Sequence, residues 1–242
     1  FAIIHKRIYF YMSFISIIVP TYNEAQNIIP LLKKISKTLS LLAKKFEIIV
    51  VDDNSPDKTG EIVNKYTKIN PLVSVIIRTK DRGLGKSIGA GIKKASGDII
   101  VGMDADFNHD PKVIPALVKG LEKSDLVVAS RFIKGGGMQD KKRFIFTLLF
   151  NKFCEIIGFP KTDNTSGFYS VRKKTLDKIG IDSIYYGYGD YHLRLVYFIK
   201  KLNYSIAQVP SYYKERYSGQ SKSKMIEMAI KYTKEALRLA MS

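Results

Sequence analysis

Clusters of polar side chains, rich in carboxylates, follow three of the strands that the sequence predicts. Residues 20–24 (PTYNE) follow the first strand, residues 52–55 (DDNS) the second and residues 104–108 (DADFN) the fourth. The carboxyl ends of parallel strands meet at one sheet edge, and ligands bind beyond that edge, so these clusters should lie together. A helix cap would explain one cluster alone. Three clusters at successive strand ends favour a ligand site.

The third cluster has the spacing of a metal site. Asp104 and Asp106 alternate along a backbone that we expect to be extended, and Asn108 continues the row, so the three side chains should point to one side. Hard oxygen ligands suit Mg²⁺ or Mn²⁺, which retain waters and bridge substrate phosphates. We therefore expect a divalent metal at Asp104, Asp106 and Asn108. Both metals accept these ligands, so the pattern does not discriminate between them.

A glycine-rich segment and several basic residues could bind phosphate. Residues 83–87 (GLGKS) resemble the end of a Walker A loop, but Lys80 stands where its first glycine is required, which argues against a P-loop. The segment is equally compatible with backbone N–H groups facing a phosphate and with a simple strand-to-helix turn. Arginine suits bidentate phosphate contact. Basic residues of this kind recur in the second half at Arg131, Arg143, Arg172, Arg216 and Lys222.

The elements that position these residues are read from hydrophobic periodicity. Short apolar runs predict strands at residues 14–19, 46–51, 73–78, 98–103 and 125–130. Helical patterns lie between them at residues 25–44, 58–66, 84–95 and 111–123. This alternation predicts an α/β fold with a mainly parallel sheet and helices on both faces.

The second half of the chain is less regular. It predicts an apolar helix at residues 144–157, a turn and strand within 163–172, a helix at 191–201, a short strand at 205–209 and a basic loop at 214–223. The tail from Lys224 is an amphipathic helix whose apolar stripe includes Ile230, Leu237 and Met241. No linker is evident. We expect one domain at residues 14–223, a C-terminal helix at 224–242 and an N-terminal extension at 1–13.

Composition limits the class of protein. The 242 residues carry a formal net charge of +18 and a single cysteine, Cys154, which excludes a disulfide framework. The charge fits nucleic acid, an anionic membrane, phosphorylated substrates or merely a lysine-rich surface. Nucleic acid is disfavoured because no stripe of basic and aromatic residues is present. The most apolar segment, residues 144–157, is shorter than the ~20 residues of a membrane span.

Taken in order, the motifs resemble a known family. PTYNE, VDDNS, GLGKS, DADFNHDP, ASRF with GGG, NTSGF and RYSGQSK resemble the inverting family 2 glycosyltransferases, in particular the dolichyl-phosphate mannose synthase and polyprenyl-phosphate branch. The resemblance covers about residues 14–222. It implies a GT-A fold, with a Rossmann-like nucleotide-binding half at about 14–130 and an acceptor half at about 131–223.

The resemblance also implies an activity. A hexose, with mannose favoured, would pass with inversion from a nucleotide-diphosphate sugar such as GDP-mannose to a dolichyl or polyprenyl phosphate. The enzyme would be cytoplasmic and peripheral on the cytoplasmic face of a membrane. Some relatives carry C-terminal transmembrane helices, so a membrane-anchoring subunit is a possible partner. A membrane surface would contact the helix at 144–157, the tail or the basic surface, although both helices could instead pack on the core.

Site residues follow from the resemblance by position. The nucleotide-sugar residues would be Pro20, Tyr22, Glu24, Val50, Asp52, Asp104, Ala105, Arg131, Arg216 and Lys222. The residues of the catalytic step would be Asp106, Arg131, Arg143 and Thr147. Among these, Arg143 and Thr147 would receive the acceptor phosphate. Arg216 and Lys222 would belong to a loop that closes over the donor diphosphate.

The sequence differs from the family pattern at one position, and two alternative functions remain open. Arg194 stands where the relatives carry Glu, so sugar or acceptor contacts on that side should differ. A family member with a glycan or protein acceptor would need a carboxylate base such as Asp190. A catalytically silent nucleotide-sugar-binding protein is the second rival. His192 could contact the acceptor, although a helix-surface histidine is the favoured interpretation.

Overall fold

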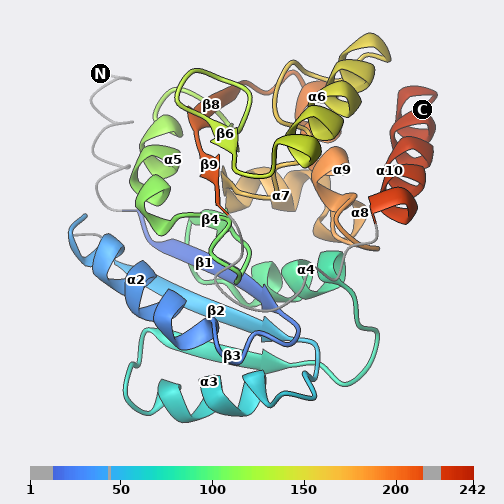
Figure 1. Cartoon of the computed structure of the whole chain (residues 1–242). Coiled ribbons are helices and arrows are strands. Elements are labelled where there is room, and N and C mark those ends of the chain that lie inside the picture. Colours follow the sequence, from blue (N-terminus) through green and yellow to red (C-terminus); the bar gives the residue numbers. More distant parts are fainter. Residues whose placement is uncertain (1–12, 43–44, 215–224) are drawn as a thin grey trace, which may run out of the picture.

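The computed structural model describes residues 13–42, 45–214 and 225–242, and of residues 225 and 226 the backbone alone. Most of the N-terminal extension predicted at 1–13, and the basic loop predicted at 214–223 apart from its first residue, lie outside these ranges. In the described residues the main sheet has seven strands in the order β3-β2-β1-β4-β7-β5-β8 (Figure 1). These strands are β1 (Ile15–Thr21), β2 (Phe46–Asp52), β3 (Val73–Ile77), β4 (Ile99–Gly102), β5 (Leu126–Ser130), β7 (Tyr169–Arg172) and β8 (Ile206–Pro210).

Helices cover both faces of the sheet, as the alternating pattern predicted. The helices of the first half are α2 (Ile28–Ser40), α3 (Thr59–Thr67), α4 (Leu84–Lys94) and α5 (Ile114–Gly120), the last preceded by the 3₁₀ turn η1 (Pro111–Val113). The second half contributes α6 (Lys141–Ile156), α7 (Lys173–Ile179), α8 (Ile181–Ile184), α9 (Tyr191–Lys201) and α10 (Met225–Ala240). A short parallel pair, β6 (Gly137–Met138) and β9 (Tyr212–Tyr213), lies apart from the main sheet.

Strand alternation explains the two cores. Successive side chains of β1 point to opposite faces, so Ile17 packs beneath α2, α3 and α5 while Ile18 packs beneath α4 and α9. Both faces are buried, which is why β1 reads as an uninterrupted apolar run. The five strands predicted in the first half are confirmed within a few residues.

One strand runs against the others. β7 is antiparallel to both β4 and β5 and lies between them, with Gly102 opposite Tyr169. The other strand pairs of the main sheet are parallel, so the mainly parallel α/β prediction is confirmed. The insertion of β7 places the 163–168 segment directly beside the ends of β4 and β5. It therefore brings second-half residues to the edge where the acidic clusters lie.

The C-terminal helix packs with a different face from the one expected. α10 lies beside α9 and buries Ala236 and Leu239 (Figure 1). The apolar stripe instead faces outward, with Ile230 at 51% and Met241 at 82% exposure. No helix within the described residues has the length and apolar character needed to cross a membrane.

Candidate functional site

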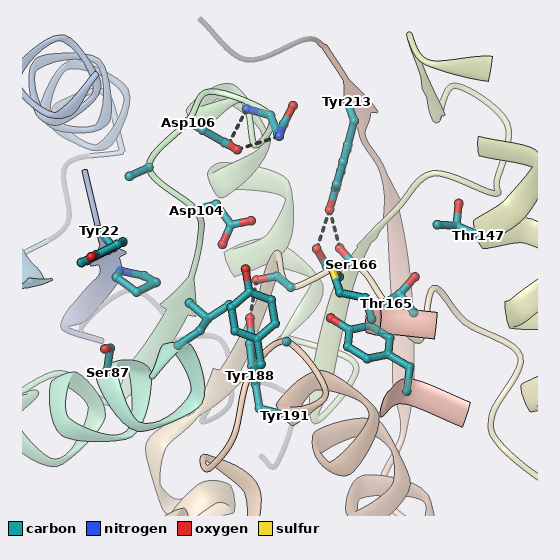
Figure 2. A pocket seen from close by; sticks show the side chains of 18 of the residues that line it. Tyr22, Ser87, Asp104, Asp106, Thr147, Thr165, Ser166, Tyr188, Tyr191 and Tyr213 are labelled. Atoms are coloured by element: carbon teal, nitrogen blue, oxygen red, sulfur yellow. Dashed lines mark hydrogen bonds between the residues drawn. The ribbon is translucent and has the colours of Figure 1, made fainter. Parts of the chain in front are cut away.

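A pocket of about 850 Å³ lies beyond the carboxyl ends of the strands, where the strand-end clusters were expected. Its walls come from both halves of the chain. Figure 2 shows Tyr22 and Ser87 on one side, Thr147 on the other, and Asp104 and Tyr188 between them. Residues predicted for the site that line the pocket are Pro20, Tyr22, Glu24, Asp104, Ala105, Asp106, Asn108, Arg131, Arg143 and Thr147.

The acidic cluster forms one wall of the pocket but is not the predicted extended row. The chain bends after β4, and Phe107 adopts a positive φ of 66°, so Asp104, Asp106 and Asn108 do not alternate along a strand. Asn108 instead turns back on Asp106. Its backbone N–H donates to one carboxylate oxygen at 3.0 Å and its side-chain amide to the other at 2.8 Å. Asn108 therefore positions Asp106.

A buried histidine supports this wall and was not singled out from the sequence. His109 accepts a hydrogen bond at Nδ1 from the Asp104 backbone N–H at 2.9 Å. Burial lowers its pKa to about 4, so the ring is neutral with its proton on Nε2. The ring stacks on Phe168 at 4.8 Å, and Nε2 lies 3.8 Å from the Asp104 carboxylate. His109 thus fixes the direction in which Asp104 leaves β4.

The residues present fit a divalent cation that shares its ligands with a substrate. Asp104 is half-exposed and offers oxygen ligands to the pocket, and Asp106 lies beside it. The described part of the chain contains no group of three or more His, Cys, Asp or Glu that could hold a metal by itself. One or two carboxylates completed by substrate phosphates and water is the arrangement typical of Mg²⁺.

The wall across the pocket from Thr147 carries Tyr22, with Arg82 beside it (Figure 2). Tyr22 is 40% exposed, and the Arg82 guanidinium lies 5.7 Å from the centre of its ring. Asp53 anchors this corner by accepting hydrogen bonds from Arg78 Nη1 and from the Gly83 backbone N–H, both at 2.7 Å. A flat aromatic and a guanidinium at a pocket mouth suit a nucleotide base and phosphate.

Two predicted base contacts lie elsewhere. Val50 is fully buried in the core beneath α2, because strand alternation turns it to that face. Asp52 accepts hydrogen bonds from the hydroxyls of Thr21 at 2.8 Å and Ser55 at 2.6 Å. It therefore joins the ends of β1 and β2 and does not line the pocket. Asp53, one residue later, is the pocket residue.

Arg131 has a structural partner that the sequence did not reveal. Its Nε and Nη2 donate to the two Asp163 oxygens at 2.7 and 2.6 Å, and Nη2 also donates to Thr165 at 2.7 Å. Burial favours neutral forms, but the ion pair outweighs it, so the pKa of Asp163 is lowered and that of Arg131 raised. Arg131 lines the pocket while it anchors the 163–167 loop.

The basic wall of the pocket is one face of α6. Arg143 and Thr147 are four residues apart and so lie on the same side of the helix. Asp140 caps the helix by accepting from the Arg143 backbone N–H at 2.9 Å. Among the described residues, the Arg143 side chain makes no hydrogen bond or ion pair, so its guanidinium can bind an anion. Arg216 and Lys222 lie outside the described residues.

Arg194, which stands where the relatives carry Glu, has a defined partner in the structure. Asp190 pairs with Arg194 at 2.8 Å and does not line the pocket. His192 is buried, contrary to the expectation of a surface histidine, and its Nε2 lies 3.2 Å from the Asp163 carbonyl oxygen. Its side of α9 packs on the 163–167 loop, which the helical pattern alone could not show.

Residues 16–180 match the glycosyl transferase family 2. The chain belongs to this family.

Two sequence relatives are mannosyltransferases of lipid phosphates. The chain is 35% identical over 218 residues to a dolichol-phosphate mannosyltransferase of Pyrococcus furiosus, covering 87% of this chain and 59% of that protein. It is 32% identical over 212 residues to an undecaprenyl-phosphate mannosyltransferase of Micrococcus luteus, covering 85% of each. The chain thus spans less than two thirds of the length of the Pyrococcus relative.

Solved structures confirm the fold. Glucosyl-3-phosphoglycerate synthase of Mycobacterium tuberculosis, in complex with Mn²⁺ and UDP-glucose, superposes with a TM-score of 0.72 at 20% identity. The match covers 99% of this chain and 83% of that one. Mannosyl-3-phosphoglycerate synthase of Rubrobacter xylanophilus gives a TM-score of 0.69 at 15% identity, covering 98% of this chain and 76% of that one. The GT-A prediction is confirmed.

Proposed function

We propose that this chain is an inverting glycosyltransferase that moves a hexose from a nucleotide-diphosphate sugar to a polyprenyl or dolichyl phosphate. Mannose, with GDP-mannose as donor, is favoured because two relatives are named mannosyltransferases of lipid phosphates. The observation that carries the proposal is the pocket itself, which is lined by Asp104 and by an Arg143 guanidinium that has no hydrogen-bond partner within the described residues.

The acceptor side needs orientation more than proton transfer. A phosphate monoester oxygen is already anionic at neutral pH, so it can attack the anomeric carbon without a base. In the proposed pose, Arg143 binds this phosphate and the Thr147 hydroxyl stands one turn along α6. Arg143 holds the attacking oxygen in line with the leaving diphosphate, and this orientation lowers the barrier to transfer. The Thr147 hydroxyl donates to the Arg143 backbone carbonyl at 2.9 Å, so it would donate to the phosphate only by giving up that bond. A single displacement inverts the sugar.

The donor side would use the acidic wall. Asp104 and Asp106 are the residues that would hold Mg²⁺ or Mn²⁺, with Asn108 fixing Asp106. The chemistry that a bound divalent cation supplies is neutralisation of charge on the leaving diphosphate. Tyr22, on the side of the pocket across from Thr147 (Figure 2), and Arg82 beside it would hold the nucleotide. The predicted roles of Arg216 and Lys222 in closing over the diphosphate remain part of this proposal.

The hydrogen bonds of Asp190 argue against a glycan or protein acceptor. A sugar hydroxyl needs a carboxylate base within hydrogen-bond reach. Asp190 accepts instead from Arg194 Nη1 at 2.8 Å and from the Tyr188 backbone N–H at 2.8 Å. Its two oxygens are therefore engaged away from the pocket.

We also propose that the enzyme docks on an anionic membrane through α6. Ile145, Leu149 and Ile156 are 57%, 64% and 84% exposed on this helix. Lys141 and Lys142 are exposed at its start, where they could meet lipid headgroups. Such a surface would place the pocket wall of α6 beside the membrane in which a lipid phosphate resides.

Docking is tested by sedimentation with phosphatidylglycerol-containing vesicles. The double variant I145S/L149S should lose most vesicle binding. Leu41→Ser, which changes an 82% exposed leucine beyond α2, should keep it. Equal binding by both variants would refute docking through α6.

The activity is tested by a donor screen. The protein is incubated with Mn²⁺ or Mg²⁺, a short polyprenyl phosphate and one of GDP-mannose, UDP-glucose or UDP-GlcNAc, and lipid products are followed by mass. We expect one donor to give a phosphate-linked glycolipid that is lost with EDTA, with Asp106→Ala and with Arg143→Ala. Lys152→Ala, an exposed basic residue on the same helix, is the matched control and should retain activity. Full activity of Arg143→Ala would refute the acceptor assignment.

A further inference from the structure

The C-terminal helix contributes to the pocket although it lies beyond the matched family segment, residues 16–180. Met228, Ala229 and Tyr232 of α10 line the pocket together with Arg143 and Phe150 of α6. To serve as a pocket wall, this helix must be held in a fixed position. The structure supplies an attachment through the departure at Arg194.

Arg194 ties α10 to the loop that borders the pocket. Its side chain is fully buried, and its Nε donates to the Ile184 carbonyl at 2.7 Å. Nη1 donates to Asp190 and to Glu235 of α10, both at 2.8 Å. Nη2 donates to the Tyr186 carbonyl, and the guanidinium lies over the Tyr186 ring at 3.6 Å. One cation therefore gathers both ends of the 184–190 loop and the helix.

On α10, the Glu235 carboxylate that pairs with Arg194 is stabilised in its ionised form by its neighbours. Glu235 also accepts from Arg238 at 2.7 Å and from the Tyr186 hydroxyl at 3.2 Å. Burial would raise the pKa of Glu235, but Arg238 and Arg194 outweigh it and lower the pKa to about 2. The carboxylate is thus ionised at every physiological pH. The buried guanidinium needs this counter-charge, since an unpaired buried charge is strongly destabilising.

The attachment through Arg194 and Glu235 places the Tyr232 side chain of α10 in the pocket wall. Its ring lies 6.1 Å from that of Phe150 on α6, on the acceptor side of the pocket. Its hydroxyl sits against Gly189, where a Cβ would collide with it. Burial raises the pKa of this phenol most, followed by Asp190, Tyr188 and Asp104, whereas Arg143 lowers it. The hydroxyl is therefore neutral, near both Asp104 and Arg143.

This hydroxyl is available to a ligand. In the part of the chain that the structure describes, no side chain or backbone group hydrogen-bonds to it. A protonated phenol can donate one strong hydrogen bond to an anionic oxygen. The neighbouring Arg143 marks where the anionic oxygen of the acceptor would lie.

We propose that α10 is the acceptor-side wall of the pocket, in which the Tyr232 hydroxyl donates to the acceptor phosphate and Arg194 and Glu235 are positioning residues. The inference rests on the proposed function, because it takes the acceptor to be a lipid phosphate. It adds a binding residue from outside the matched family segment and gives a role to the buried arginine at residue 194.

The test separates acceptor binding from donor binding. Steady-state transfer is measured while the polyprenyl phosphate and the nucleotide sugar are varied in turn. Tyr232→Phe should raise the acceptor KM about tenfold, the effect of losing one hydrogen bond to a charged group, and leave the donor KM within twofold. Glu235→Gln should raise the acceptor KM in the same direction, because α10 loses its charged attachment.

The matched control is Tyr197→Phe. That tyrosine lies on α9, and its hydroxyl contacts Ser242 at 3.2 Å at the far end of α10, away from the pocket. It should leave both KM values unchanged. An acceptor KM within twofold of the parent for Tyr232→Phe, with active parent enzyme, overturns this inference alone. No transfer by the parent to any polyprenyl phosphate overturns the proposed function, and this inference with it.

Discussion

The buried pair of Arg131 and Asp163 supports a quantitative prediction about stability. Asp163 is completely buried and Arg131 is 3% exposed. The pair is joined by Nε–O and Nη2–O contacts of 2.7 and 2.6 Å, and a third bond runs from the Arg131 backbone N–H to Asp163 at 3.1 Å. The substitution Asp163→Ala leaves the guanidinium buried without its counter-charge.

The expected cost follows from burial. Removal of one partner from a buried ion pair costs about 3–5 kcal/mol, because the remaining charge stays desolvated. A domain of ordinary stability has ~5–15 kcal/mol in total, so the variant should lose a large share of it. Lys152 and Glu155 form a comparison pair at 2.9 Å on the surface of α6. Glu155→Ala there should cost ~1 kcal/mol or less.

The assay is urea unfolding followed by circular dichroism for the parent, Asp163→Ala and Glu155→Ala. Acidity provides a second readout. Arg131 holds the pKa of Asp163 below its unfolded value, so the stabilisation is fully present above pH ~4 and is lost as the pH falls further. The difference in the free energy of unfolding between the parent and Asp163→Ala should therefore become smaller at acidic pH. A cost for Asp163→Ala no larger than that for Glu155→Ala would refute the argument.

Three further outcomes are expected. Asp104→Ala should lower Mn²⁺-dependent binding of GDP by at least tenfold in calorimetry, because the pocket loses one of its two cation-facing carboxylates; binding as tight as the parent's would contradict the metal assignment. Gly189→Ala should raise the acceptor KM while the donor KM stays constant, because its Cβ displaces the Tyr232 hydroxyl. Burial lowers the pKa of His192 to about 4, so the folded state resists protonation and stability should fall as the pH drops from ~6.5 towards 4. His192→Gln should reduce that slope in urea titrations at pH 7 and 5, and an unchanged slope would argue against it.

Local pattern determined the first half of the fold. The strands β1 to β5 and the helices between them follow from apolar runs and helical periodicity, which are properties of short segments. The strand-end rule then correctly brought residues 20–24 and 104–108 to one pocket. Strand alternation, applied strictly, would also have turned Val50 to the core.

Contacts between distant segments determined the position of β7 in the sheet and the buried face of α10, which local sequence patterns do not predict. β7 joins β4 and β5 in antiparallel fashion, an arrangement that depends on contacts between residues about 70 apart, such as Gly102 and Tyr169. The apolar stripe of α10 predicted its buried face wrongly, because Arg194 and Glu235 fix the rotation of the helix.

The sequence by itself therefore determined the class of fold and the acidic strand ends. These depend on residue types at fixed local spacing. The tertiary structure alone decided that Arg131 would pair with Asp163, that Asp190 would turn away from the pocket and that Tyr232 would enter it. Each of these outcomes is a choice of partner between distant segments. Such choices are made by the burial of charge and the packing of rings, which no short stretch of sequence contains.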